Sequence, residues 1–355
     1  MTARRLQVLA LAAIVLLAAG IWLAIHRDAS RSNMGGGKVF ADLEAALGDV
    51  TEIRLSRGDG GRATLRRAAE GWTVVERAYP ADPQRVRELA LALARLEVIE
   101  SKTRDPANYA RLGVEAPDSP TAASTLVEVV AGDKSWSLIV GKPADGRAVY
   151  VRKPQEPAAA LAQPTLTADP DQKRWIDRAL TDIPGADVRE VAISPASGPS
   201  YLLSRAKPGE PNVTLSPIPK GRTAVSAMSL DAQPDALAAF NFDDVHPLPA
   251  PAPAATDRAT FRTFDGQVIE FAGRRDGDKA YVTVAARREP AAEAAVKPAE
   301  PATPQEPAKP RPAAQTVERL APRAAGVEYE IPLYKYEGIF KPREDLLEKP
   351  ASAKG

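Results

Sequence analysis

The stretch VTEIRLSRGDGGRATLRRAAEGWTVVE, residues 50–76, decides how the rest of the chain is interpreted. Polar and apolar side chains alternate around Ile53 and Leu55, and the alternation resumes after residues 58–61 and after Gly71. A period of two is typical of half-buried strands, and glycine clusters mark the turns between strands. The stretch therefore predicts three short antiparallel strands.

The glycines at 58–61 resemble a phosphate-binding loop, but such a loop joins a strand to the N-terminus of a helix. Here strand-like patterns stand on both sides, so we expect a hairpin turn. Two other glycine-lysine pairs lack the Ser or Thr that follows lysine in a P-loop: Val39 follows Lys38, and Pro143 follows Lys142. We interpret the first as part of a linker and the second as a turn that ends a strand.

The second half of the chain repeats this pattern. The segment VREVAIS, which begins at Val188, mirrors VTEIRLS in length, alternation and the position of its acidic residue. Each half also has a segment with helical signals: Asp82-Pro83 opens an apolar stripe, and residues 231–240 are the counterpart. We therefore expect an α+β protein with two tandem related units, each a twisted antiparallel sheet with a covering helix. The predicted bounds are 49–186 and 187–349.

Helices are also predicted over residues 172–180 and 342–348. Residues 289–323 interrupt the second unit with proline, alanine and scattered charges. Such a segment buries too little apolar surface to offset the entropy of ordering it. We expect a disordered insertion, with a docking site for a partner as the alternative.

The run from Leu6 to Ile25 contains no charged residue. Its length matches a bilayer core, which takes about 20 helical residues. A cleaved signal peptide is the alternative, although its apolar region is normally about 7–15 residues. We predict a transmembrane helix after a short cytoplasmic tail within residues 1–27, followed by a flexible tether over 28–48. The bulk of the chain is then periplasmic, at a bacterial inner membrane.

Composition excludes several kinds of chemistry. The 355 residues include 47 basic and 46 acidic side chains, no cysteine and two histidines. A chain with this balance has no field that attracts nucleic acid, and it has no disulfide or thiolate. We expect no catalytic residues, no cofactor and no metal site.

Three groups of residues nevertheless suggest chemistry. Ser204 and Lys207 have the Ser-x-x-Lys spacing of penicillin-recognising enzymes, but they fall in a strand-to-turn segment. Asp243 and Asp244 beside His246 suggest a small metal cluster, and we interpret them as a solvated turn with a surface histidine. The third group is a candidate aromatic binding surface for glycan or peptide, with core packing as the alternative. Its members are Trp72, Trp136 and Trp175.

The order of short motifs over residues 50–195 resembles the family catalogued as domain of unknown function 4340. The resemblance implies a single-pass bacterial membrane protein with a large extracytoplasmic part, and some members are encoded beside ABC-type transport subunits of the gliding-motility class. It implies no catalytic residue. The motifs include Gly71-Trp72, Tyr79-Pro80-Ala81-Asp82, Asp105-Pro106, Tyr109, Leu112-Gly113-Val114, Val140-Gly141-Lys142, Tyr150-Val151-Arg152 and Trp175-Ile176-Asp177.

We therefore predict a non-enzymatic, membrane-tethered periplasmic accessory or scaffold protein. Its expected partner is an envelope protein or an ABC-type membrane complex. The alternatives are a periplasmic module that binds glycan or peptide, and an envelope hydrolase that acts through carboxylates.

Overall fold

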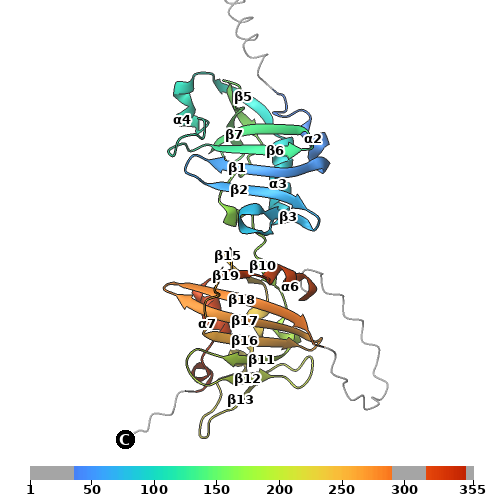
Figure 1. Cartoon of the computed structure of the whole chain (residues 1–355), viewed down its shortest axis with the longest axis vertical. Coiled ribbons are helices and arrows are strands. Elements are labelled where there is room, and N and C mark those ends of the chain that lie inside the picture. Colours follow the sequence, from blue (N-terminus) through green and yellow to red (C-terminus); the bar gives the residue numbers. More distant parts are fainter. Residues whose placement is uncertain (1–35, 290–316, 349–355) are drawn as a thin grey trace, which may run out of the picture. The chain divides into compact units, whose positions relative to one another are not determined.

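The computed structural model describes residues 36–289 and 317–348. These residues pack into two compact units, which divide between Trp175 and Ile176. Residues 77–80 are an exception, because they pack within the second unit although they precede most of the first in the chain. Both units consist mainly of antiparallel sheet with few helices, which confirms the predicted α+β class (Figure 1).

The first unit is built on a sheet with the strand order β3-β2-β1-β6-β7-β8-β9-β5, in which every neighbouring pair is antiparallel. The inward residues of its central strands are fully buried, as the alternation in the sequence predicts. The strands are β1 (Val50–Arg57), β2 (Arg62–Ala68), β3 (Gly71–Val74), β5 (Glu97–Thr103), β6 (Thr125–Ala131), β7 (Lys134–Ala144), β8 (Ala148–Arg152) and β9 (Ala159–Gln163).

The predicted helix of the first unit is α3 (Pro83–Ala94). The Asp82 carboxylate caps it by accepting the backbone N–H groups of Gln84 and Arg85. Its buried face includes Leu89 and Leu93. The remaining helical elements are α2 (Leu43–Ala46), η1 (Leu47–Asp49), η2 (Val75–Arg77), η3 (Pro106–Asn108), α4 (Tyr109–Leu112) and η4 (Gln172–Arg174).

The glycine cluster forms the predicted hairpin turn, since β1 pairs with β2 across it. Gly60 takes a positive φ of 91°, a conformation that favours glycine. A Cβ atom on Gly58 would lie 1.8 Å from the carbonyl oxygen of Ser119. Gly58 thus permits a close approach of two backbone segments.

Residues 36–48 do not form a free tether, contrary to the prediction. The Gly36 N–H donates to the Val98 carbonyl (3.1 Å), and the Val39 N–H donates to the Leu96 carbonyl (2.7 Å). Leu43 of α2 is fully buried. The backbone bonds and this apolar anchor fix the segment to β5, while residues 28–35 of the predicted tether lie outside the described residues.

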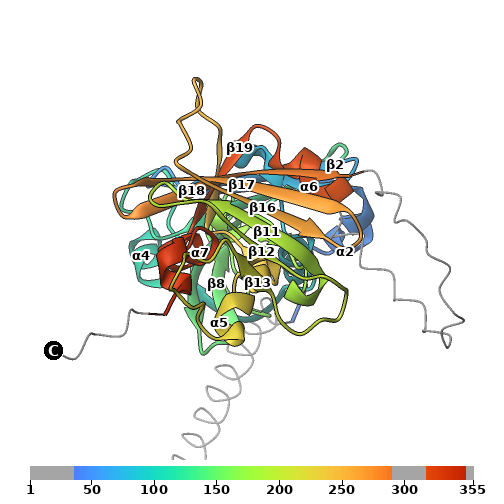
Figure 2. The ribbon, with the colours of Figure 1, turned by 90° about the horizontal axis from the view of Figure 1, so that it is seen from below.

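The second unit contains a sheet with the order β13-β12-β11-β16-β17-β18-β19-β15, whose strands follow one another across the view in Figure 2. A small pair, β10 with β14, accompanies it. The strands are β4 (Tyr79–Pro80), β10 (Ala179–Thr181), β11 (Val188–Ser194), β12 (Tyr201–Ser204), β13 (Thr214–Ser216), β14 (Phe240–Asn241), β15 (Asp244–Pro247), β16 (Asp257–Thr263), β17 (Gln267–Asp276), β18 (Lys279–Arg288) and β19 (Val327–Ile331).

The two sheets are built alike around β1 and β11. Strand β1 lies between β2 and β6, and β11 lies between β12 and β16. The ladder from β1 to β6 shifts register between Val50 and Glu52. The ladder from β11 to β16 shifts register between Val188 and Glu190, which are the matching positions of the two similar segments.

The helices of the second unit differ from the predictions. The expected helix over 231–240 is absent: α5 ends at Asp231, and the short 3-10 helix η6 and the start of β14 follow. The expected helix over 172–180 is only η4 followed by β10. Residues 317–323 of the predicted insertion belong to helix α6, contrary to the prediction of disorder there, and residues 290–316 lie outside the described residues. The helical elements are η5 (Gly185–Asp187), α5 (Ala227–Asp231), η6 (Pro234–Leu237), α6 (Val317–Ala324), α7 (Leu333–Ile339) and η8 (Arg343–Leu346).

Within residues 36–289 and 317–348, no helix has the length and apolar character that a membrane span requires. The predicted transmembrane segment from Leu6 to Ile25 lies outside these residues.

Candidate functional site

The three tryptophans do not form a common surface. Trp136 and Trp175 are 8% and 2% exposed, while Trp72 is half-buried. The Trp136 indole N–H donates to Asp42 Oδ1 (2.9 Å), and that of Trp175 donates to the Asp169 carbonyl (2.7 Å). Three strands separate β3, which carries Trp72, from β7, which carries Trp136. The buried pair acts as core anchors with satisfied polar groups.

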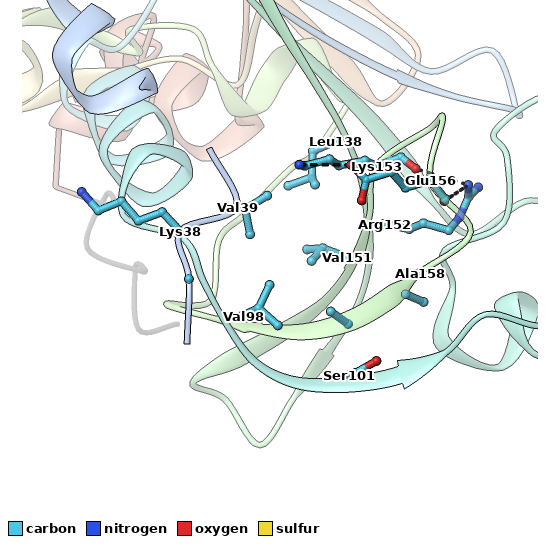
Figure 3. Close-up of a pocket in the computed structure, with 13 residues that line it drawn as sticks. Lys38, Val39, Val98, Ser101, Leu138, Val151, Arg152, Lys153, Glu156 and Ala158 are labelled. Atoms are coloured by element: carbon cyan, nitrogen blue, oxygen red, sulfur yellow. Dashed lines mark hydrogen bonds and ion pairs between the residues drawn. The ribbon is translucent and has the colours of Figure 1, made fainter. Parts of the chain in front are cut away.

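A pocket of about 340 Å³ opens in the first unit between β5, β7, β8, β9 and residues 37–39 (Figure 3). This volume falls within the range of about 300–1,000 Å³ that is common for ligand pockets. The walls are of mixed character: Lys38, Ser101, Arg152, Lys153 and Glu156 are polar, and the apolar side chains are small or branched. These are Val39, Val98, Leu138, Val151, Ala158 and Ala160.

Polar groups near the pocket are already engaged with one another. Lys153 Nζ lies 3.3 Å from Glu156 Oε1. The Arg152 guanidinium is buried and donates from Nε to the Val114 carbonyl (2.9 Å), with its Cζ 4.6 Å from the centre of the Tyr109 ring. Arg152 therefore holds the loop that contains Val114, and the apolar residues form only part of the pocket wall.

Strand β5 gives the pocket an accessible edge. Among the described residues it is the last strand of its sheet, and residues 36–39 pair with its first half only. Register shifts between Val98 and Glu100 and between Ser101 and Thr103 accompany its pairing with β9. Ile99 is 43% exposed on the uncovered half, while Ser101 lines the pocket. Backbone groups of the strand edge and a pocket with a branched apolar wall thus lie side by side.

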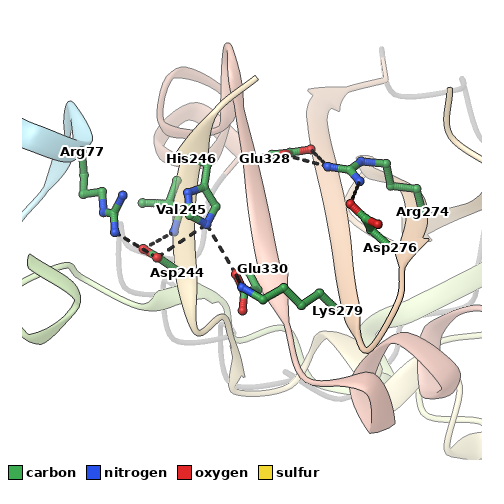
Figure 4. A network of polar contacts seen from close by, with 9 residues as sticks. All are labelled: Arg77, Asp244, Val245, His246, Arg274, Asp276, Lys279, Glu328 and Glu330. Carbon is green, nitrogen blue, oxygen red and sulfur yellow. Dashed lines mark hydrogen bonds and ion pairs between the residues drawn. The ribbon is translucent and has the colours of Figure 1, made fainter. Parts of the chain in front are cut away.

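A network of charged side chains occupies one face of the second unit (Figure 4). In the pairing of β15 with β19, Asp244 lies opposite Glu330, and His246 lies opposite Glu328. Residues two apart on a strand share a face, so the four side chains project together. Asp244 is only 1% exposed and belongs to a strand, so the predicted solvated turn is wrong.

Cations neutralise the carboxylates of this face. Arg77 Nη2 and Asp244 Oδ2 are 3.0 Å apart, and Lys279 Nζ and Glu330 Oε2 are also 3.0 Å apart. The hydrogen bond and charge attraction from Glu330 raise the pKa of the Lys279 ammonium. Beside this group, Arg274 donates to both oxygens of Glu328 at 2.9 and 3.0 Å.

The family comparison supports part of the resemblance described above. A family model described as "Domain of unknown function (DUF4340)" matches residues 72–262, which is more than half of the chain. The chain belongs to this family. The DUF4340 match extends past residue 195, where the resemblance in motifs ends, and reaches Arg262 in β16. Neither a search of curated proteins nor a search of solved structures gives a significant match.

In this DUF4340 chain, Ser204 ends β12 and Lys207 lies in the turn that follows, as expected from the strand-to-turn interpretation. The residues that sequence reasoning missed are those of β5 and β9. Residues 159–163 belong to an alanine-rich stretch without the period-two alternation that indicates a strand. Strict alternation is also broken at Ile99, where a register shift turns two consecutive side chains outward.

Proposed function

We propose that the chain is a non-catalytic accessory protein that is held at a bacterial inner membrane by Leu6 to Ile25. Its two units are then periplasmic, and the first unit binds an extended segment of a membrane-protein partner. The observation that carries this proposal is the pocket, with its branched apolar wall, beside the half of β5 whose outer edge no described residue pairs with.

An extended peptide fits this arrangement better than a compact ligand. An added strand forms main-chain hydrogen bonds with an exposed sheet edge, and pockets beside the edge select its side chains. Residues 99–103 form this edge. Ser101 belongs to the edge and also lines the pocket, so the pocket lies beside the edge. Val98 and Val151 offer branched apolar walls, so the expected anchor is an aliphatic or aromatic side chain.

The position of the pocket favours a partner at the membrane. Residues 37–39 line the pocket, and the predicted span ends at Ile25. The intervening residues reach at most about 40 Å when fully extended. The resemblance described above implies that some members of the family are encoded beside ABC-type transport subunits, so such a subunit is the partner that we propose.

Photo-crosslinking in the native membrane tests this function. With a photoreactive amino acid at Ile99 or Lys102 of the full-length protein, we expect both positions to capture the same ABC-type subunit, identified by mass spectrometry. Met228 of the second unit, which is 85% exposed, serves as the reference position and should not capture it.

A pocket-filling substitution separates specific binding from general proximity. Ala160→Trp fills the pocket and should lower the Ile99 adduct at least about fivefold, since a blocked anchor loses the hydrophobic contribution of a buried side chain. Ala144→Trp, at another half-buried alanine in the same sheet, should leave the adduct unchanged. Equal adducts from Ile99 and Met228, or no effect of Ala160→Trp, would argue against the proposal.

A further inference from the structure

We infer that Asp244, His246 and Glu330 form a binding site for a first-row divalent metal ion, with Zn²⁺ as the expected occupant (Figure 4). This inference concerns the second unit and is independent of the peptide site proposed in the first. It also revises the expectation from the sequence that the chain has no metal site.

The spacing of the three side chains matches that of ligands around one ion. His246 Nε2 lies 3.5 Å from Asp244 Oδ2 and 3.5 Å from Glu330 Oε2. Each distance is at the limit of hydrogen bonding. Two ligands at about 2.1 Å from a tetrahedral zinc ion are separated by roughly 3.4 Å. The three ligand atoms all lie within 4.8 Å of one another, so one ion reaches all of them.

The imidazole nitrogen needs a partner in this position. His246 Nε2 is a buried atom that has no hydrogen-bond partner within the described part of the chain. Leaving a buried polar atom without a partner is destabilising. The Tyr281 ring packs edge-on against the imidazole ring, with centroids 6.3 Å apart. A metal ion would satisfy this nitrogen.

The backbone holds the ligands without a flexible loop. Asp244 and His246 are two residues apart on β15, and Glu330 is the direct pairing partner of Asp244 on β19. Side chains on paired strands keep fixed separations of about 4.5–5.5 Å between their Cβ atoms. This placement is suited to a histidine and two carboxylates as a three-residue ligand set, with water as the fourth ligand.

Charge balance determines what an incoming ion displaces. Arg77 is largely buried and donates to Asp244, so we expect it to stay in place. Lys279 is 56% exposed and can move its ammonium into water when an ion reaches Glu330. Lys279 is therefore a competitor for the site. Its removal should strengthen metal binding.

Calorimetric titration of the chelator-treated full-length protein with zinc chloride tests the inference. We expect one Zn²⁺ per chain, and the same protein with Co²⁺ should show the visible absorption of a low-symmetry cobalt site. His246→Ala should weaken Zn²⁺ binding by about 100-fold, since outer-shell losses alone cost about 10–100-fold. Lys279→Gln should tighten binding.

The second histidine of the chain supplies a matched control. His26→Ala removes the only other imidazole in the sequence and should leave zinc binding unchanged. Glu330→Gln keeps the shape of the side chain and should also weaken zinc binding, so it tests the site if His246→Ala disturbs folding. Circular dichroism checks the fold of each variant. Absence of stoichiometric binding, or binding lost in His26→Ala and kept in His246→Ala, would overturn the site.

Discussion

Replacing Tyr79 with alanine is expected to lower the free energy of unfolding of the second unit by about 3–5 kcal/mol, the range for large aromatic-to-alanine substitutions. Tyr79 is 1% exposed and packs edge-on against Phe242 and Tyr329, with ring centroids 5.6 and 6.0 Å away. Such aromatic pairs add stability beyond the area they bury. Burial also raises the pKa of the Tyr79 hydroxyl.

Chemical denaturation of the full-length protein, followed by circular dichroism, measures this loss. Hydrogen exchange then shows whether the destabilised amides belong to the second unit. Tyr79→Phe removes only the 3.4 Å contact between the hydroxyls of Tyr79 and Tyr329, so it should cost about 1 kcal/mol. Tyr334→Ala, at a tyrosine that is 70% exposed, should change stability by less than about 0.5 kcal/mol. Similar losses at Tyr79 and Tyr334 would contradict the assignment.

The substitution Gly141→Ala should destabilise the first unit by about 3 kcal/mol, at the upper end of the usual cost of overpacking. A Cβ atom at this position would lie 2.5 Å from the Leu112 carbonyl oxygen and 2.7 Å from the Gly113 carbonyl oxygen. Both neighbours are backbone atoms, which cannot move away as a flexible side chain can. Strand β7 would have to move away from the loop that follows α4 to make room for the methyl group.

Gly48→Ala is the matched control for this prediction. The same methyl group at Gly48 would meet no atom within 4 Å, and the backbone there does not require glycine. Thermal unfolding of both variants should therefore show a lower transition for Gly141→Ala alone. If the two variants unfold at the same temperature, the close approach at Gly141 is not a constraint on the fold.

The sequence predicted best those elements that local physical chemistry determines. Strand β6 was expected over TLVEVVA, and it has those bounds because every second side chain is buried. The turn at Asp265-Gly266 joins β16 to β17 as an Asp-Gly pair predicts. The cap at Asp82 likewise depends on two neighbouring N–H groups. None of these requires knowledge of distant residues.

The candidate sites were harder to predict because distant segments create them. Residues 244–247 form a strand only through their pairing with β19, which lies more than 80 residues later. Asp244-Val245-His246 does alternate, but four residues before a proline-rich stretch are too few to indicate a strand. The pocket likewise depends on β9. Its alanine-rich sequence does not indicate a strand, and it forms one because it pairs with β5 on one side and β8 on the other.

The placement of residues 77–80 in the second unit also constrains the time course of biosynthesis. Tyr79 and its partner Tyr329 are 250 residues apart, so at about 5–20 residues per second the ribosome needs roughly 12–50 s to produce the partner. The sequence of the first unit is complete long before then. On the nascent chain Tyr79 therefore lacks Tyr329 until β19 emerges, and a chain that terminates before Val327 never acquires this contact.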